Sequence, residues 1–258
     1  MLKNRIIPTL LWKNVGLVKG RGFDSRRRVG TILPAVNVYN LRQVDELILV
    51  DITATAESRD PDYATVEEIS RECFVPLTVG GGIRTLDHIR ELLRHGADKV
   101  CINSAAYRDP ELIRQAADRF GSQCILASID YRTTSQGPRC FRSCGTEDTG
   151  RDPVSWAREL EASGAGEILL TSIERDGTME GYDTATLAQV SAAVRIPVIA
   201  SGGCGCYAHM AQALEEGHAS AVAAASIFHF TQQTPQEAKH FLRSRGLPVR
   251  LALLNHKT

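Results

Sequence analysis

The sequence repeats itself at about half its length, and this repeat restricts the possible folds more than any other feature. Three segments of the first half have counterparts about 120 residues later: Leu49–Thr53 and Leu169–Ile173, Val79–Ile83 and Ala200–Cys204, and Val100–Ala105 and Val222–Ile227. Segments that recur at one fixed spacing indicate repeated structural units that pack against each other. We therefore expect two similar halves, joined without a linker, that close into one domain over residues 1–258.

Short runs rich in β-branched residues alternate with stretches of helical period along the chain. This alternation is typical of βα units around a parallel sheet. Eight runs are predicted as strands: Arg5–Leu10, Glu46–Asp51, Pro76–Val79, Lys99–Asn103, Cys124–Asp130, Glu167–Ser172, Pro197–Ser201 and Ala221–Ala225. Helical patterns between them include Ala64–Cys73, Leu86–His95, Pro110–Phe120, Pro153–Ser163, Ala185–Val194 and Tyr207–Glu216.

The length of 258 residues matches the usual size of one closed α/β barrel. Two helix starts carry an aspartate N-cap before a proline at the first helical position, at Asp109-Pro110 and Asp152-Pro153. The sequence therefore predicts an α/β fold, a single (β/α)8 TIM barrel of the phosphate-binding type, with a core over about residues 5–250.

The composition argues for a small-molecule partner. Thirty basic and thirty acidic residues cancel, so we expect no attraction to nucleic acid or to a membrane surface. No segment approaches about 18 consecutive apolar residues and the N-terminal segment has no small-residue cleavage site, which predicts a cytoplasmic protein. We expect no disulfide, no cofactor and no metal, because Cys140, Cys144, Cys204 and Cys206 lack the usual spacing of zinc ligands.

Two segments show little regular pattern, Gly16–Thr31 and Tyr131–Thr149. Each follows a predicted strand, and in this architecture the loops after strands form the catalytic face. Long loops at that face are candidate lids. The alternative is a mobile insertion without a role.

Glycine-rich turns follow the third and seventh predicted strands, one in each half. Glycine lets the backbone approach an anion closely, and N–H groups at the start of the next helix can then contact phosphate oxygens. Two such turns at half-barrel spacing predict a substrate with a phosphate at each end, although glycine at a tight turn can also have only a steric function. The phosphate-binding candidates are Gly81, Gly82, Asn103 and Ser104, and Gly202, Gly203, Ala225 and Ser226.

Three aspartates follow strands at the predicted catalytic face. Asp130 ends the fifth strand, where a carboxylate points into the barrel mouth and can act as general acid or base. The alternative is a cap for the following loop. Asp51 and Asp176 are expected to hydrogen-bond a hydroxylated substrate or loop backbone rather than transfer a proton.

Charged residues stand at the opposite ends of four strands: Arg5, Glu46, Lys99 and Glu167. Such charges are costly inside a protein unless they are paired. From the residues alone, we interpret them as a salt-bridged plug that closes the bottom of the barrel.

Taken together, many strand ends resemble one known family. The matching segments are Met1–Pro8, Val18–Gly20, Leu49–Ala54, Pro76–Arg84, Gly121–Cys124, Gly164–Ser172, Arg175–Thr178, Gly181–Asp183, Ser201–Gly203 and Ser226–Phe230. They resemble the HisF family, the cyclase subunit of imidazole glycerol phosphate synthase. The resemblance runs from Met1 to about Arg250 and includes nearly every strand end.

The resemblance implies roles at both ends of the barrel. Asp130 takes the position of one of two catalytic aspartates. Arg5, Glu46, Lys99 and Glu167 take the positions of a gate through which ammonia enters the barrel, so the plug interpretation is reversed. A HisH-type glutaminase subunit is the expected partner, because the family's glutaminase docks against this end.

The resemblance also implies contacts for other residues. Asp98 matches a contact with the glutaminase, and Thr78, Asn103, Gln123 and Thr171 would line the interior above the gate. The implied substrate-binding residues are Lys19, on a mobile first loop, and Asp51, Thr171, Asp176 and Gly177.

One departure from the family concerns the other catalytic aspartate, which lies at the end of strand one. Here the chain has Leu11 at that position, within Leu10-Leu11-Trp12-Lys13, and the following Asn14–Leu17 is less polar than is usual in the cyclase. Leucine cannot transfer a proton. If the imidazole-forming reaction needs two carboxylates, this chain should be a poor cyclase.

A neighbouring branch of the family shares the Leu10-Leu11 pair and Val44–Asp51. Proteins of this branch are associated with surface-polysaccharide synthesis, in which ammonia from a glutaminase turns an acetamido group of a nucleotide sugar into an acetamidino group. We therefore expect this sugar amidination. The alternatives are the histidine-pathway cyclase and a non-catalytic barrel that docks and activates the glutaminase, but Asp130 and the two glycine turns argue against the last.

Overall fold

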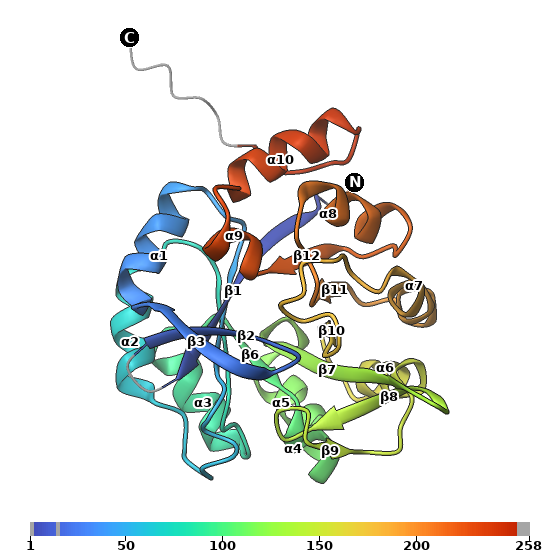
Figure 1. Ribbon diagram of the computed structural model, residues 1–258. Coiled ribbons are helices and arrows are strands. Elements are labelled where there is room, and N and C mark those ends of the chain that lie inside the picture. Colours follow the sequence, from blue (N-terminus) through green and yellow to red (C-terminus); the bar gives the residue numbers. More distant parts are fainter. Residues whose placement is uncertain (1–2, 14–15, 252–258) are drawn as a thin grey trace.

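The computed structural model describes residues 3–13 and 16–251, so Met1, Leu2, Asn14 and Val15 of the motifs above lie outside the described residues. Eight parallel strands pair in chain order, and the last pairs with the first through Arg5 and Ala221 to close a barrel (Figure 1). These strands are β1 (Arg5–Lys13), β4 (Leu47–Asp51), β5 (Leu77–Gly80), β6 (Lys99–Ile102), β7 (Ile125–Thr134), β10 (Glu167–Ser172), β11 (Val198–Ser201) and β12 (Ala221–Ala224). The predicted (β/α)8 barrel is confirmed.

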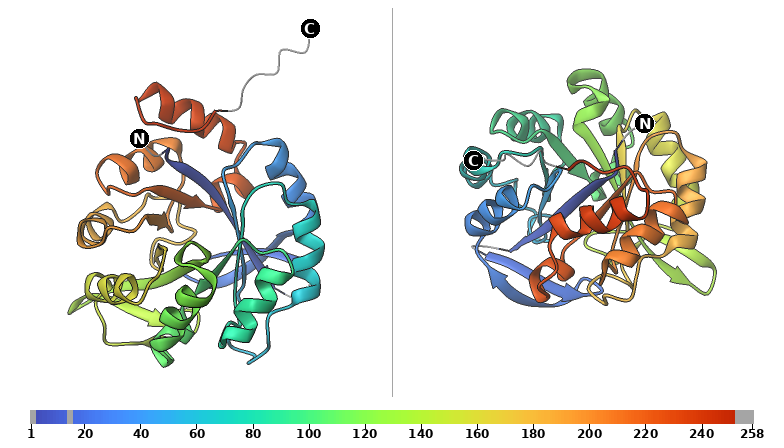
Figure 2. Two further views of the ribbon diagram at one scale, coloured as in Figure 1. Left: turned by 180° about the vertical axis from the view of Figure 1, so that it is seen from behind. Right: turned by 90° about the horizontal axis from the view of Figure 1, so that it is seen from above.

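Helices surround the barrel, as the views in Figure 2 show. They are α1 (Ile32–Leu41), α2 (Tyr63–Glu72), α3 (Leu86–Arg94), α5 (Glu111–Phe120), α6 (Pro153–Ala162), α7 (Thr184–Ala193), α8 (Tyr207–Glu215) and α10 (Pro235–Ser244). Two five-residue helices, α4 (Ser104–Arg108) and α9 (Ser226–Phe230), and the 3-10 helix η1 (Ser122–Cys124) complete the set. No helix of the described part of the chain is long and apolar enough to cross a membrane.

The two predicted aspartate caps have different outcomes. Asp152 caps α6 by accepting hydrogen bonds from the Val154 and Ser155 amides, with Pro153 at the first helical position. At α5 the helix begins at Glu111, one residue later than expected, so Pro110 is the cap residue. The Asp109 carboxylate still accepts a hydrogen bond from the Glu111 amide at 3.1 Å.

Successive side chains along each strand point alternately into and out of the barrel, so the apolar side chains form an inner and an outer layer. Ile6 and Leu49 pack outward into the core shared with the helices. Their neighbours Ile7 and Ile48 join an inward-facing cluster that includes Cys101, Leu126, Leu169, Ile199 and Ala223. Because side chains fill it, the interior of the barrel is packed rather than an open pore.

The two segments expected to lack regular structure form antiparallel hairpins, so that expectation was wrong. β2 (Gly16–Arg21) pairs with the end of β1 and with β3 (Asp24–Gly30), and the hairpin lies across the barrel opening in Figure 1. After β7, strands β8 (Gly137–Arg142) and β9 (Glu147–Asp148) form the second ribbon. The first four residues of β2 are buried, but they include Gly16 and Lys19, and β8 has a single buried residue, Cys140, so neither segment shows the alternating apolar pattern of a strand.

Candidate functional site

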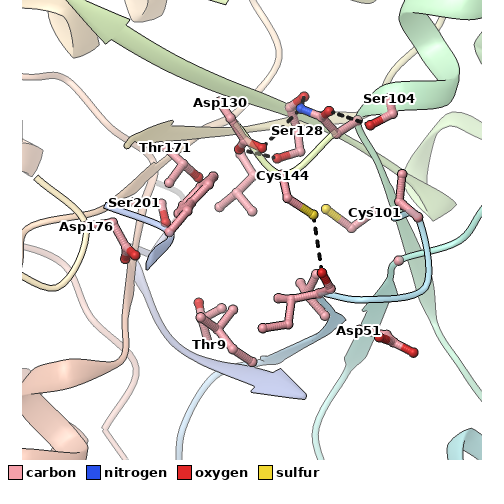
Figure 3. A pocket seen from close by; sticks show the side chains of 18 of the residues that line it. Thr9, Asp51, Cys101, Ser104, Ser128, Asp130, Cys144, Thr171, Asp176 and Ser201 are labelled. Atoms are coloured by element: carbon pink, nitrogen blue, oxygen red, sulfur yellow. Dashed lines mark hydrogen bonds between the residues drawn. The ribbon is translucent and has the colours of Figure 1, made fainter. Parts of the chain in front are cut away.

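A cavity of about 300 Å³ opens at the carboxyl ends of the barrel strands (Figure 3). Both halves of the chain line it, and so does the first hairpin through Lys19, Gly20 and Phe23. Strand ends direct alternate side chains into this mouth, which is where barrels of this kind carry their active sites. The mouth is therefore the candidate active site.

Asp130 lies on β7 and its carboxyl group faces the cavity, as predicted. It accepts hydrogen bonds from Asn103 Nδ2 and from Ser128 Oγ, both at 3.2 Å. Burial raises the pKa of Asp130 to about 7; the hydrogen bond from Ser128 opposes this rise and the nearby negative charge of Asp176 adds to it. A carboxyl group with this pKa can hold or release a proton near neutral pH.

Leu11 lies on β1 opposite Val50 of β4 and also lines the cavity. It follows Ile7 and Thr9 on the inward-facing side of the strand, because inward positions alternate along β1. An apolar side chain therefore occupies the place where the family resemblance expects a second carboxylate. Among the described residues lining the cavity, the carboxylates are Asp51, Asp109, Asp130 and Asp176.

The Asp51 carboxylate is engaged by the loop that follows β4. Its Oδ1 accepts hydrogen bonds from the amides of Thr53 at 2.9 Å and Ala54 at 3.0 Å, and Arg59 Nη2 pairs with its Oδ2 at 3.1 Å. Both oxygens thus hold the loop. This matches the expected bonding to loop backbone and leaves Asp51 poorly placed for proton transfer.

Lys19 lies in strand β2 rather than in an irregular loop, and its side chain is buried against the cavity. Burial lowers the pKa of Lys19 to about 8, although the negative charge of Asp176 opposes the shift. Asp176 lines the same cavity, and its carbonyl oxygen accepts a hydrogen bond from the Gly22 amide at 2.9 Å. The hairpin is therefore fastened to the turn after β10.

Gly177 shows how close this contact is. Its φ is +73°, and an added Cβ would lie 2.0 Å from the carbonyl oxygen of Gly20. Any side chain at this position would push the hairpin away from the mouth. The sequence singled out Gly177 for substrate binding, but the structure shows directly only a packing contact.

The glycine turns have equivalent geometry in the two halves. Gly81 has φ +105° and Gly202 has φ +88°, and a Cβ on either would come within 2.5 Å of the carbonyl oxygen of Asp51 or Ser172 respectively. The next glycines, Gly82 and Gly203, also have positive φ. Both turns line the cavity. The close backbone packing that requires glycine at these positions is therefore compatible with a role of the same backbone in binding an anion.

The short helices α4 and α9 begin beside these turns, after Asn103 and Ala225 respectively. The side-chain amide of Asn103 contacts Asp130, and Ser104 Oγ accepts a hydrogen bond from the Ser143 amide at 2.9 Å. The side chains of Asn103 and Ser104 are thus engaged within the protein. Both residues, with Ala225 and Ser226, nevertheless line the cavity.

At the opposite end of the barrel, four charged residues form a closed ring of ion pairs, which we call the charged ring: Arg5, Glu46, Lys99 and Glu167. Arg5 Nη1 lies 2.7 Å from a carboxylate oxygen of each glutamate, and Lys99 Nζ lies 3.1 Å from Glu46 and 3.0 Å from Glu167. Burial by itself would lower the pKa of Arg5, but Glu167 and Glu46 raise it above its ordinary value. Every charge in the ring is thus paired twice.

Other residues expected near the ring have mixed placements. Thr78 is buried on β5, and Thr171 faces the cavity from β10. Gln123 was expected inside the barrel, but it is exposed on η1 because the chain turns there before β7 begins. Asp98 is also exposed, and its carboxylate accepts a hydrogen bond from the Leu77 amide at 2.8 Å.

The side chains of the mouth that sequence reasoning missed include Ser128, Arg84 and Arg108. Ser128, which bonds Asp130, had a usable signal, because it stands two residues earlier on the same face of β7. Arg84 and Arg108 line the cavity beside the first-half glycine turn. Arg108 is the last residue of α4 and corresponds to Phe230, the last residue of α9. A comparison of the two halves therefore shows a charged residue in the first half where the second half has an apolar one.

The described residues contain no group of three or more His, Cys, Asp or Glu side chains that could hold a metal ion. The chemistry that these residues themselves supply at the mouth is that of Asp130, of Lys19 and of backbone or guanidinium groups that bind anions.

Comparisons with known proteins agree with this architecture. The profile of the family described as "Histidine biosynthesis protein" matches residues 5–234. Two curated relatives are each 47% identical over 251 residues, covering 97% of this chain and all of the relative; they come from Pelodictyon phaeoclathratiforme and Chlorobium luteolum. Both are named imidazole glycerol phosphate synthase subunit HisF.

Proposed function

Because the chain belongs to the histidine biosynthesis protein family and, within it, to the HisF family, we propose that it is the synthase subunit of a glutamine-dependent amidotransferase. It adds ammonia from a HisH-type glutaminase to a phosphorylated substrate. The observation that carries this proposal is the arrangement of two sites at opposite ends of one barrel: the charged ring at one end and the Asp130 cavity at the other.

The charged ring can open without losing all its pairs. Lys99 makes the two longer contacts, and its charge sits on a flexible four-carbon chain. If Lys99 swings outward, Arg5 still pairs with both glutamates at 2.7 Å. Lys99 is therefore the residue we expect to admit ammonia from a glutaminase docked on this face.

The interior above the charged ring favours neutral ammonia. The cluster of Ile7, Ile48, Leu126, Leu169 and Ile199 is apolar, so an ammonium ion would lose its hydration there without a compensating partner. Ammonia therefore reaches the mouth as a nucleophile rather than as its unreactive protonated form.

At the mouth, the two glycine turns bind the phosphorylated ends of the substrate and hold the reacting carbon near Asp130. When the ammonia nitrogen bonds to that carbon, a carbonyl carbon, the C=O π electrons move to the oxygen, which is protonated and leaves as water, while the nitrogen becomes positively charged and must lose a proton. Asp130, with a pKa of about 7, takes this proton on its carboxylate. Asn103 and Ser128 hold the carboxylate in place.

Two reactions fit this site. The names of the relatives support the first, formation of imidazole glycerol phosphate in histidine biosynthesis. The second, amidination of a nucleotide sugar for surface polysaccharide, is favoured by Leu11, which leaves the mouth without a carboxylate on β1. An amidination that needs only one protein carboxylate is compatible with Leu11, whereas a two-carboxylate cyclisation is not.

The two ends of the mouth also differ in charge, and this difference bears on the second reaction. Arg84 and Arg108 line the first-half end, and Arg108 makes no ion pair with another described residue. The equivalent positions of the second half are Gly205 and Phe230. Guanidinium groups can bind a diphosphate through several hydrogen bonds, but a nucleotide sugar carries this group only once, between its two halves, so it would use this end and leave the second glycine turn without a phosphate.

A barrel that only docks and activates the glutaminase remains the third possibility. It would need neither the raised pKa of Asp130 nor two equivalent glycine turns at the far end of the barrel. These features support a catalytic subunit.

The two reactions are separated by giving the purified protein ammonia and the ribosyl-aminoimidazole substrate of the histidine pathway. If a second carboxylate is needed, turnover should be about 10² to 10⁴-fold slower than in a two-aspartate cyclase. Leu11→Asp should then restore activity, whereas Leu11→Asn, of similar size but unable to transfer a proton, should not. Rapid turnover by the unmodified chain would support the histidine reaction and place Asp176 in the missing role.

A further inference from the structure

A buried ion pair joins the last helix to the strands that carry the charged ring. Lys239 of α10 is 4% exposed and Asp45, just before β4, is 8% exposed. Their Nζ and Oδ1 atoms lie 2.7 Å apart, and Lys239 Nζ also donates a hydrogen bond to the Gln43 carbonyl oxygen at 2.7 Å. Gln43 adopts φ +54°, a left-handed conformation that a non-glycine residue seldom takes.

Burying two charges is costly, and a pair of apolar side chains often gives the same stability. Stability alone therefore does not explain this ion pair, and the contacts of Asp45 show a geometry that it fixes. The second carboxylate oxygen of Asp45, Oδ2, accepts a hydrogen bond from the Ile6 amide at 2.8 Å, so the pair fixes the position of Asp45 relative to β1. The Asp45 amide in turn donates to the Ile6 carbonyl oxygen at 3.3 Å.

These contacts lie beside two members of the charged ring. Ile6 directly follows Arg5, and Asp45 directly precedes Glu46. The parallel pairing of β1 with β4 begins only at Thr9 and Ile48, so it does not reach these strand starts. The Asp45–Ile6 bonds supply the missing link between the two backbones at the level of the charged ring.

The chain after α10 is hydrogen-bonded to the start of β1. Asn4, which precedes Arg5, donates its amide to the Pro248 carbonyl oxygen at 2.7 Å and forms a bridge with Val249. The segment after α10 therefore holds the start of β1 from one side, while Lys239 holds Asp45 from the other.

We infer that Lys239 and Asp45 are positioning residues for the charged ring: they hold Arg5 and Glu46 at the separation that keeps the ring closed. This inference rests on the proposed function, in which the ring admits ammonia. Without the pair, Arg5 and Glu46 shift relative to each other, and ammonia from the glutaminase escapes at the junction instead of entering the barrel.

The test compares two sources of ammonia in the complex with the glutaminase. The variant is Lys239→Met together with Asp45→Leu, which replaces the buried pair by apolar side chains of similar size and removes the carboxylate oxygen that accepts a hydrogen bond from the Ile6 amide. We expect synthesis from added ammonium salt to stay within about twofold of the unmodified complex. Synthesis from glutamine should fall about fivefold or more, with more glutamine hydrolysed per product formed, because a loosened gate loses ammonia.

Arg245→Met is the matched control. It removes the ion pair between Arg245 and Glu215 at the end of the same helix, away from the charged ring. We expect it to leave the ratio of glutamine-driven to ammonia-driven synthesis unchanged. An equal loss from both ammonia sources in the double variant, or no loss from either, would overturn the positioning role.

A crystal structure of the double variant gives a readout that does not depend on activity. If the unmodified complex makes no product from glutamine, the proposed function fails, but the geometry of the ring can still be measured. The inference predicts that the contacts of Arg5 with Glu46 and Glu167 lengthen or break. A ring that stays closed with all four contacts intact would refute it.

Discussion

At the charged-ring end of the barrel, Arg5 and Lys99 each contact both Glu46 and Glu167. At the mouth, Asp130 makes hydrogen bonds to Asn103 and Ser128 but no ion pair with a described basic side chain. Each charge of the ring thus faces two charges of opposite sign. Burial without an ion pair at the mouth instead moves the pKa of Asp130 to about 7, where it can exchange a proton.

The two ends thus show how one barrel can keep the entry of ammonia apart from the reaction that uses it. A fully paired set of charges can close the barrel, because each side chain is held by two partners of opposite charge. A buried carboxyl group held by neutral donors is less stable as an anion and is therefore a useful base.

Replacing the mouth carboxylate should have the largest effect. Asp130→Asn keeps the shape and the hydrogen-bonding side chain but removes the base, so the ammonia-driven rate should fall about 10² to 10⁴-fold, or roughly 3 to 5 kcal/mol. Steady-state kinetics with saturating ammonia would measure it. A variant that keeps more than about a tenth of the rate would show that Asp130 is not the proton acceptor.

The same variant should change the pH dependence of stability. Because the folded pKa of Asp130 lies above its ordinary value, its contribution to stability is present below about pH 4 and is lost as the pH rises through 7. Asp130→Asn removes this loss, so at pH 8 the variant should be more stable than the unmodified chain by roughly 2 to 4 kcal/mol. At pH 4 the gain should vanish.

Urea unfolding at both pH values would check this prediction. If the variant and the unmodified chain differ in unfolding free energy by the same amount at pH 4 and at pH 8, folding does not raise the pKa of Asp130.

The smallest effect concerns the first-half end of the mouth. Arg108→Ala should weaken pyrophosphate binding about three- to tenfold, roughly 1 kcal/mol, because one guanidinium contact is lost at a solvent-exposed rim. Arg114→Ala is the matched control, since Arg114 is also exposed but lies on α5 and pairs with Glu111. Titration calorimetry would detect the change, and equal affinity in both variants would remove the charge argument for a diphosphate.

The strands of the barrel could be predicted because buried parallel strands require runs of apolar, β-branched residues. All eight predicted strands are present, with ends displaced mostly by one to three residues; β1 and β7 run on because they pair with the hairpins. The hairpins themselves gave no such signal. In β3, Asp24–Gly30 contains three consecutive arginines, a composition that an exposed ribbon tolerates and that resembles a loop.

Positions in the candidate site were more predictable than contacts. Strand ends placed Asp130 and Asp176 at the mouth, whereas Thr171 was expected to contact substrate only from the family resemblance. The sequence could not show that the Asn103 side-chain amide turns toward Asp130, because this depends on the packing of β6 against β7. Gln123 was misplaced for a similar reason, since a short 3-10 turn before the strand directs its side chain outward.

If the charged-ring face docks a glutaminase and the mouth uses its ammonia, the two chains should form a complex in solution. Sedimentation velocity would test this on the purified protein, at about micromolar concentration and with its phosphorylated substrate, mixed with a HisH-type glutaminase from the same organism. We expect one heterodimeric species, which Asp98→Lys at the ring face weakens and Arg108→Ala at the mouth does not. A protein that sediments alone under these conditions would contradict it.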